Sequence, residues 1–320
     1  MYRIGIDLGG TNIAVGILNQ EMKIVHRASI PTDLPQKPET LADRIAELVF
    51  QMLKETEIPA EAVISAGIGI PGTVNPHNGM VEYANNLDFI QVPFSKILGR
   101  FFPFPLYGVN DAKAAAWGEY VAGAGKGSSS MMMVTLGTGI GGAMIINGKI
   151  VDGFNFAAGE IGHMVIEHNG RLCNCGRRGC FEVYASATAL VEEAERAALA
   201  CRDSLLYKVQ NGASEKINGK VFFDAVRKGD ETAASVLEWF TGYLSVGICN
   251  LVNIFQPEIL CIGGGISSAG EILFAPLREK VYPLVYSRDS EINTKIAGAK
   301  LGNDAGIIGA AGLESLNYFM

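Results

Sequence analysis

Apolar positions recur along this chain with two different spacings. Near the N-terminus Ile4, Ile6 and Leu8 alternate with other residues, and an apolar run at 13–18 follows a glycine turn, which predicts two strands. From Glu39 to Thr56 the apolar residues recur at helical spacing, which predicts an amphipathic helix. Strands and helices therefore alternate from the start of the chain.

Further elements follow from the same patterns. They are an apolar run at 63–70, helices at 111–122, near 185–201 and near 230–255, a short strand ending at Gly263-Gly264-Gly265, and a packed helix at 304–316. Mixed strands and helices along the whole chain predict an α/β protein.

The opening pattern returns in the middle of the chain. A buried strand is predicted at 131–136, followed by a glycine turn and a second strand. Placing Asp7 over Thr135 pairs Leu8 with Leu136 at an offset of 128 residues, without gaps. A strand, a glycine turn and a strand at the start of both halves indicate a duplicated fold.

Composition and charge narrow the function classes. The 320 residues are 48% hydrophobic and 18% charged, which suggests about two domains and excludes bulk disorder. The formal net charge of −7 argues against nucleic-acid or anionic-membrane partners. Because no long apolar run and no signal peptide are apparent, we expect a cytoplasmic protein.

Three known types of nucleotide-binding site use glycine-rich turns, and each can be compared with this sequence. A P-loop fails, because Gly125-Lys126 is followed by glycine and no glycine lies five residues before it. A Rossmann turn matches Gly137, Gly139 and Gly142 by letter, but a strand follows where a helix is needed. The third is a phosphate held in hairpin turns, which two facing turns can grip from both sides.

The hairpin hypothesis gives the neighbouring polar residues a role. Glycines let backbone N–H groups converge on an anion, and Thr11 and Thr138 add hydroxyl donors. Asp7, at a strand end beside its turn, can hold Mg²⁺ directly or through water. The alternative is that both turns are simply tight hairpins.

Four potential metal ligands lie within 18 residues. His163, Cys173, Cys175 and Cys180 form a set of three thiolates and one imidazole, which is typical of closed, structural zinc sites. A catalytic zinc would need an open coordination position, and four protein ligands leave none. The alternative is three unligated cysteines and an unrelated histidine.

These motifs together resemble a known family. Residues 7–12 and 136–142 resemble the two phosphate motifs of the actin/Hsp70/sugar-kinase superfamily, and 262–266 resembles its adenosine motif. Glu160-Ile161-Gly162-His163, followed by the Cys-rich stretch 173–182, is similar to the signature of the ROK family (repressors, open reading frames, kinases). The resemblance covers nearly the whole chain.

The ROK resemblance implies a two-lobed, actin-like ATPase fold of duplicated RNase H-like type, with an interlobe active-site cleft. We expect a small N-terminal lobe at 1–122 and a large lobe at 123–303 that carries the zinc loop 163–180. A C-terminal helix at about 304–320 is expected to pack back on the small lobe. The family also implies a homodimer or homotetramer that binds a hexose and a nucleotide.

The resemblance also implies functions for individual residues of this chain. Sugar-binding positions are Gly72, Asn86, Asn110, Asp111, Glu160, His163 and Glu182. Positions for ATP and Mg²⁺ are Asp7, Gly9, Gly10, Thr11, Asn12, Gly137, Thr138, Gly139, Gly264 and Gly265. His163 would use one ring nitrogen for the sugar and the other for zinc, so that the metal fixes the orientation of the imidazole.

Asp111 is the candidate catalytic base. From the residues alone, Asn110-Asp111 at the start of an alanine-rich helix favours a helix cap. The family resemblance favours catalysis instead, with Asp111 taking the proton of the sugar 6-hydroxyl as that oxygen attacks the γ-phosphate of ATP. The zinc motif most resembles that of ROK glucokinases, so glucose is the expected substrate.

Three alternatives stay open beside glucose phosphorylation. The substrate can be fructose, mannose, N-acetylmannosamine or N-acetylglucosamine. The protein can also be a non-catalytic sugar sensor. A ROK repressor is disfavoured, because the phosphate motif begins at Ile4 and we expect no helix-turn-helix before it.

Overall fold

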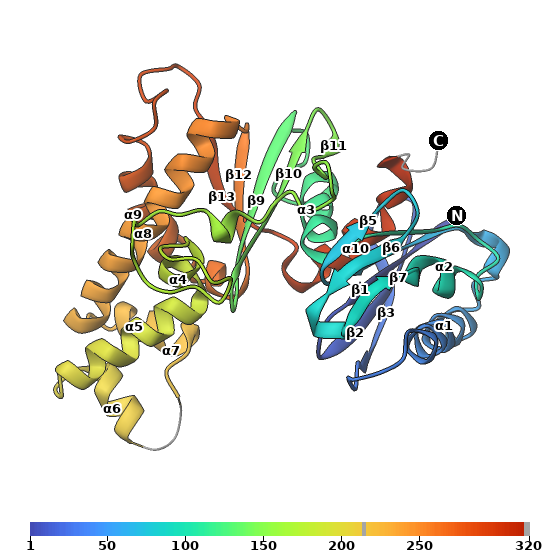
Figure 1. The fold of residues 1–320 in the computed structure, drawn as a ribbon, viewed down its shortest axis with the longest axis horizontal. Coiled ribbons are helices and arrows are strands. Elements are labelled where there is room, and N and C mark those ends of the chain that lie inside the picture. Colours follow the sequence, from blue (N-terminus) through green and yellow to red (C-terminus); the bar gives the residue numbers. More distant parts are fainter. Residues whose placement is uncertain (213–215, 317–320) are drawn as a thin grey trace. The chain divides into compact units, whose positions relative to one another are not determined.

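The computed structural model describes residues 1–212 and 216–316, and its first sheet is built around the N-terminal strand. The strand order is β3-β2-β1-β4-β8, and Figure 1 labels β1, β2 and β3 of this sheet. The strands are β1 Tyr2–Leu8, β2 Asn12–Leu18, β3 Ile24–Pro31, β4 Val63–Ile70 and β8 Leu106–Asn110. β1, β4 and β8 are parallel, whereas β1-β2-β3 is an antiparallel meander.

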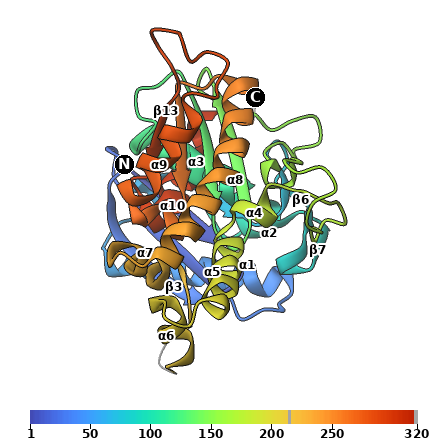
Figure 2. The ribbon, with the colours of Figure 1, turned by 90° about the vertical axis from the view of Figure 1, so that its left-hand side faces the viewer.

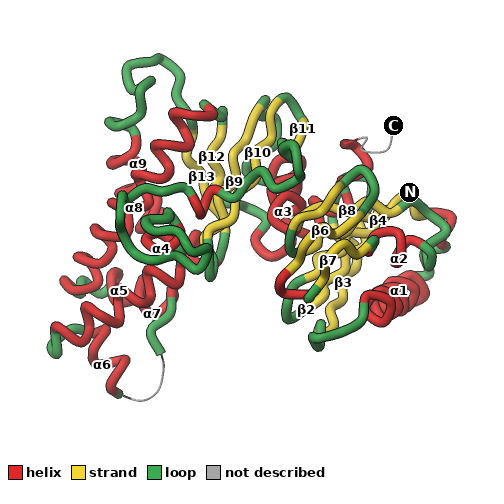
Figure 3. The backbone as a smooth tube through the Cα atoms, viewed as in Figure 1, coloured by secondary structure: helices red, strands yellow, loops and turns green. Residues whose placement is uncertain are grey.

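The second sheet repeats this arrangement, with the order β11-β10-β9-β12-β13 (Figure 3). Its strands are β9 Ser130–Leu136, β10 Ile140–Ile146, β11 Lys149–Ile150, β12 Ile259–Gly263 and β13 Lys295–Gly298. β9, β12 and β13 are parallel, and β10 pairs antiparallel with β11. Since β9 and β10 begin and end 128 residues after β1 and β2, the predicted duplication is confirmed.

The α-helices are α1 Pro38–Glu55, α2 Phe94–Gly99, α3 Asp111–Ala122, α4 Glu182–Ala185, α5 Ala187–Ala200, α6 Leu205–Asn211, α7 Gly219–Arg227, α8 Glu231–Phe255, α9 Glu271–Val281 and α10 Ala305–Ala311. The helices predicted at 39–56, 111–122, 185–201 and 230–255 are present within two residues of their predicted bounds, whereas α2, α4, α6, α7 and α9 were not predicted. Short 3₁₀ helices are η1 Ala60–Ala62, η2 Asn85–Leu87, η3 Ile161–His163, η4 Gly265–Ala269, η5 Gly302–Asp304 and η6 Leu313–Leu316.

The C-terminal helix is shorter than the sequence predicts. α10 ends at Ala311, and Gly312 separates it from the 3₁₀ turn η6. Residues 317–320, to which the expected helix extended, lie outside the described residues.

Contacts divide the chain into two units. The first comprises Met1–Ser130, Ala143–Gly159 and the chain from Lys300, and the second comprises Met131–Gly142 and Glu160–Ala299. From the sequence we expected the boundary between the two lobes to lie between residues 122 and 123. That boundary would place residues 143–159 with the second unit. These residues group with the first unit because, among other contacts, the buried Lys113 ammonium lies 2.9 Å from Asp152 Oδ1 and 2.9 Å from the Phe156 carbonyl.

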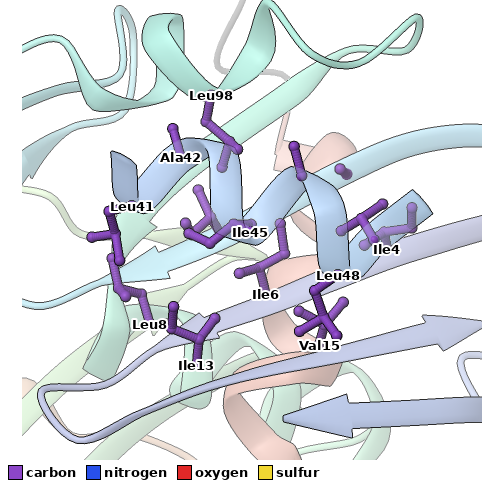
Figure 4. Close-up of a cluster of buried hydrophobic side chains, with 14 of the residues drawn as sticks. Ile4, Ile6, Leu8, Ile13, Val15, Leu41, Ala42, Ile45, Leu48 and Leu98 are labelled. Atoms are coloured by element: carbon purple, nitrogen blue, oxygen red, sulfur yellow. The ribbon is translucent and has the colours of Figure 1, made fainter. Parts of the chain in front are cut away.

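The core of the first unit lies between α1 and the sheet. Leu41, Ile45 and Leu48 of α1 face Ile4 and Ile6 of β1, and all five side chains are buried (Figure 4). The apolar side chains that recur every three or four residues along α1 therefore pack against the alternate side chains of β1. Both periodicities predict this contact.

α3 and α10 pack unusually closely in the first unit. A Cβ on Gly309 would lie 1.7 Å from the carbonyl oxygen of Ala114, so only glycine permits this approach. The fully buried Glu119 carboxylate of α3 accepts backbone N–H bonds from Ala124, Lys300 and Leu301 at 2.7–2.8 Å. These contacts fix α3, whose first turn carries Asp111.

A small third sheet was not predicted. β5 Thr73–Asn75, β6 Met80–Ala84 and β7 Phe89–Val92 pair antiparallel, and η2 connects the last two strands. This sheet carries Asn86 in η2.

Helices dominate the second unit. α8 and α9 pack side by side, and Figure 2 shows α5 and α7 among the helices of the same unit. Within the described part of the chain, no helix combines the length and the apolar character needed to cross a bilayer.

Candidate functional site

Asp111 is the first residue of α3, directly after the carboxyl end of β8. The helix cap is its neighbour Asn110, whose Oδ1 accepts the Lys113 N–H at 3.1 Å. Asn110 Nδ2 donates to Asp111 Oδ1 and to the Gly72 carbonyl, each at 2.9 Å. Because Asn110 supplies the N-cap, capping does not account for an aspartate at position 111.

The Asp111 carboxylate is held in one orientation. Its Oδ1 accepts the N–H of Ala112 at 2.9 Å as well as the Asn110 amide. Burial raises the pKa of Asp111, although the hydrogen bonds from the backbone and from Asn110 lower it. A carboxyl group with a raised pKa is a better proton acceptor than an ordinary aspartate, provided that it is ionised.

Asp7 lies near the end of β1, two strands away from β8 in the same sheet. Its register partner on β4 is Gly69, which in turn pairs with Val109 on β8. Burial first, and then the Asp111 carboxylate, raise the pKa of Asp7 to about 6. Two carboxylates at the carboxyl ends of parallel strands form a candidate site for Mg²⁺ and a reacting hydroxyl.

The first glycine turn is fixed by a residue that the sequence analysis missed. The buried Thr32 donates its hydroxyl to the Gly9 carbonyl and its N–H to the Thr11 carbonyl, both at 2.8 Å. In a trans peptide the next N–H points opposite to the carbonyl. The N–H groups of Gly10 and Asn12 therefore point away from Thr32, as an anion-binding turn requires.

One predicted sugar position of the first unit, Asn86, lies near this turn, and another, Gly72, contacts the end of the strand that leads to Asn86. A Cβ on Gly10 would lie 4.0 Å from Cβ of Asn86, which is exposed. Gly72 has a φ of +102°, and a Cβ there would lie 2.2 Å from the Tyr83 carbonyl. The structure thus gathers Asn86, Gly72 and Asn110 on the side of the first unit that carries Asp111.

The second glycine turn is held in the same way as the first. Ala187 donates its N–H to the Gly137 carbonyl at 2.9 Å, and the Thr188 hydroxyl donates to the Thr138 carbonyl at 2.8 Å. By the same peptide geometry, the N–H groups of Thr138 and Gly139 point away from α5. A threonine behind each turn carries no sequence signal of its own, which is why both were missed.

The proposed adenosine motif forms a tight turn after β12. Gly264 has a φ of +90°, and a Cβ there would lie 2.2 Å from the Leu136 carbonyl at the end of β9. The turn is closed by Ser267, whose hydroxyl donates to the Gly264 carbonyl at 2.7 Å. Gly264 and Gly265 are exposed, so a ligand can reach this backbone.

The four predicted metal ligands come together in the second unit. One ligand atom from each of His163, Cys173, Cys175 and Cys180 lies within 4.8 Å of all the others. His163 Nδ1 is 3.7 Å from Cys173 Sγ, and Cys175 Sγ is 3.6 Å from Cys180 Sγ. Ligands about 2.3 Å from one tetrahedral ion lie about 3.7 Å apart, so the spacing fits zinc.

The cluster also leaves one nitrogen of the histidine for another partner. Nδ1 of His163 faces the sulfur atoms, which leaves Nε2 as the second donor or acceptor. Burial and the neighbouring thiols raise the pKa of Cys180 to about 12 in the metal-free protein. A cation would ionise this thiol, because zinc binds the thiolate form.

Two carboxylates flank the metal cluster. Glu160 is exposed at the start of η3, where its carbonyl accepts the His163 N–H. Glu182 begins α4, and its Oε2 accepts the N–H of Ile140, directly after the second glycine turn, at 2.9 Å. The structure thus engages Glu182 with the glycine turn, a contact that the sequence analysis did not predict.

Comparison with known proteins agrees with these motifs. The ROK family profile matches residues 3–315. A glucokinase of Thermotoga maritima is 39% identical over 97% of this chain and 96% of its own length. A glucokinase of Streptomyces coelicolor is 36% identical over the same shares of the two chains.

A solved structure matches over the whole chain as well. The crystal structure of a ROK family glucokinase from Streptomyces griseus in complex with glucose and AMPPNP is 34% identical and has a TM-score of 0.80. The match covers 98% of this chain and 99% of that one. The family resemblance and the actin-like fold that it implied are therefore confirmed, and this chain belongs to the ROK family.

Proposed function

We propose that this protein is an ATP-dependent glucokinase that transfers the γ-phosphoryl group of ATP to the 6-hydroxyl of glucose. The observation that carries this proposal is the arrangement of Asp111, a partly buried carboxylate that is oriented by Asn110 and is not the N-cap of the helix. Relatives 36–39% identical over nearly the whole chain are glucokinases, which supports glucose as the sugar.

Asp111 acts as the general base in this proposal. Its carboxylate takes the proton of the 6-hydroxyl while that oxygen forms a bond to the γ-phosphorus of ATP. The bond from this phosphorus to the β–γ bridging oxygen breaks, and ADP leaves with the electron pair. Phosphoryl transfer needs mainly positioning and charge neutralisation, and a single well-placed carboxylate supplies the proton transfer.

The glycine turns bind the nucleotide. The N–H groups of Gly10, Asn12, Thr138 and Gly139 donate to the phosphates of ATP, and Gly264-Gly265 lie against the adenosine. Asp7 holds Mg²⁺ directly or through a water molecule. When bound, Mg²⁺ neutralises charge on the transferring phosphoryl group.

The proposal also assigns residues to the binding of glucose. We assign this role to Gly72, Asn86, Asn110, Asp111, Glu160, His163 and Glu182. Of these, His163 can use Nε2, because its Nδ1 faces the thiols.

The Cys/His cluster binds one structural zinc ion. Three cysteine sulfurs and one imidazole nitrogen complete a tetrahedral set, so zinc would hold the loop and orient His163 without taking part in the reaction. The family resemblance further supports a homodimer or homotetramer. Cysteines that bind a metal rather than forming disulfides are consistent with the reducing cytoplasm.

A sugar panel tests the proposed function. Release of ADP from ATP is measured with glucose, mannose, fructose, N-acetylmannosamine and N-acetylglucosamine at equal concentrations. The proposal predicts that glucose gives the highest kcat/KM. Faster turnover of another sugar would replace glucose as the substrate, and stabilisation by a sugar without any turnover would indicate a sensor.

A further inference from the structure

One short segment connects the metal cluster to the second glycine turn. Residues 180–188 begin at the metal ligand Cys180 and run through α4 to the start of α5. Along this segment, Glu182 accepts the Ile140 N–H, Ala187 donates to the Gly137 carbonyl, and Thr188 donates to the Thr138 carbonyl. We call residues 180–188 the strap.

The strap is fixed at its metal end. The Phe181 N–H donates to the Met164 carbonyl at 2.8 Å, directly after the ligand His163. The Phe181 ring is fully buried, and a Cβ on Gly247 of α8 would lie 2.3 Å from it. The two ends of the metal motif are therefore joined to each other and to α8 by one residue.

A second contact reaches the same turn from the histidine side. Gly162, which precedes His163, is buried against the strand that leaves the turn, and a Cβ there would lie 2.3 Å from the Ile140 carbonyl. Ile140 is thus contacted through its N–H by Glu182 and at its carbonyl by Gly162. Both contacts come from residues within two positions of a metal ligand.

We propose that the metal loop positions the phosphate-binding turn 137–139 through Glu182 and the strap, so that metal binding strengthens nucleotide binding even without sugar. This inference rests on the proposed function, because it takes turn 137–139 to bind the nucleotide phosphates. Glu182 is then a positioning residue for the nucleotide in addition to its proposed contact with the sugar. Removing either the metal or the Glu182 carboxylate frees Ile140 and loosens the turn.

The test measures nucleotide affinity by calorimetry with AMPPNP and Mg²⁺, without sugar. Glu182→Ala in the metal-loaded protein is expected to weaken AMPPNP binding about tenfold, as the loss of one hydrogen bond to a charged group does. Thr188→Val, at an exposed position on the strap, is expected to weaken it about threefold. Glu192→Ala, at an exposed position of α5 outside the strap, is the control and is expected to leave AMPPNP affinity unchanged.

Removal of the metal completes the test. The chelated wild-type protein is expected to lose about as much AMPPNP affinity as Glu182→Ala, and chelation of Glu182→Ala is expected to add little, because both changes act through one path. Unchanged AMPPNP affinity, within twofold, in Glu182→Ala and Thr188→Val would overturn the inference. If the chelated protein shows no cooperative unfolding transition, it is no longer folded, and the two variants in the metal-loaded protein then decide the test. Wild-type protein that does not bind AMPPNP at all would overturn the proposed function and the inference together.

Discussion

Asn110 caps helix α3 with its Oδ1 and holds Asp111 with its Nδ2, so one side chain serves both the fold and the candidate base. The two tasks can be separated. Asn110→Ser keeps an acceptor for the helix N-terminus but loses the donor to Asp111, whereas Asn110→Ala loses both.

We expect both Asn110 variants to lower kcat/KM for glucose by about 10-fold to 100-fold, the effect of one hydrogen bond to a charged group. Only Asn110→Ala should also lower the free energy of unfolding, by about 1 kcal/mol. Steady-state kinetics and urea unfolding measure the two effects. Wild-type kinetics in Asn110→Ser would show that the Asn110 amide does not orient Asp111.

Thr32 offers a test of the first glycine turn. Thr32→Val removes the hydroxyl that holds the Gly9 carbonyl but keeps the shape of the buried side chain. We expect KM for ATP to rise about 3-fold to 10-fold, with KM for glucose nearly unchanged, because the turn loses one of its two anchors.

The matched control for Thr32 is Thr56→Val. The Thr56 hydroxyl also donates to a backbone carbonyl at 2.8 Å, but at the end of α1. Its loss should affect stability and leave KM for ATP unchanged. Equal changes of KM in the two variants would contradict the role given to Thr32.

The pKa of Asp7 predicts how stability depends on pH. Burial and Asp111 raise this pKa to about 6, from 3.8 in a model peptide. Between these two values the unfolded chain ionises first, so the carboxylate destabilises the fold increasingly as pH rises to about 6, and constantly above it.

Asp7→Asn removes this destabilisation, because the asparagine side chain does not ionise. Without Mg²⁺ and nucleotide, it should raise the free energy of unfolding at pH 7.5 by about 1 to 3 kcal/mol, and by less at pH 4.5. Urea unfolding at the two pH values measures the difference. A stabilisation that is equal at both pH values, or absent at pH 7.5, would show that burial does not raise the pKa of Asp7.

The metal site predicts a difference between two cysteine substitutions. Cys180→Ser should abolish zinc binding and lower the melting temperature, because the binding energy of a structural metal contributes to folding. Cys201→Ser, at an exposed cysteine outside the cluster, should keep about one zinc per chain. Elemental analysis measures the metal. Wild-type protein that is fully active without zinc would refute the site.

The sequence predicted best what local spacing determines. The glycine turns, the repeat that begins at Tyr2 and Ser130, and the four metal ligands are all short-range patterns, and the structure contains each of them. α3 begins at Asp111 as predicted, but the sequence could not tell which of two adjacent capping residues makes the cap. Only the hydrogen bond from Lys113 to Asn110 decides that.

Contacts between residues that lie far apart in the chain could not be predicted from the sequence. Thr32 lies 23 residues from Gly9, and Glu182 lies 42 residues from Ile140, so no local pattern joins either pair. The strands of the third sheet, such as β5 at Thr73–Asn75, are too short to give a clear alternation.

The most direct test of the glucokinase account is formation of glucose 6-phosphate by the wild-type protein and by Asp111→Asn. The product is detected with glucose 6-phosphate dehydrogenase, and glucose affinity is measured separately by calorimetry. We expect wild-type protein to form one glucose 6-phosphate per ADP. Asp111→Asn should be slower by about 10²-fold to 10⁴-fold, with glucose affinity changed by only a few fold. No glucose 6-phosphate from wild-type protein, or near-full turnover in Asp111→Asn, would contradict the account.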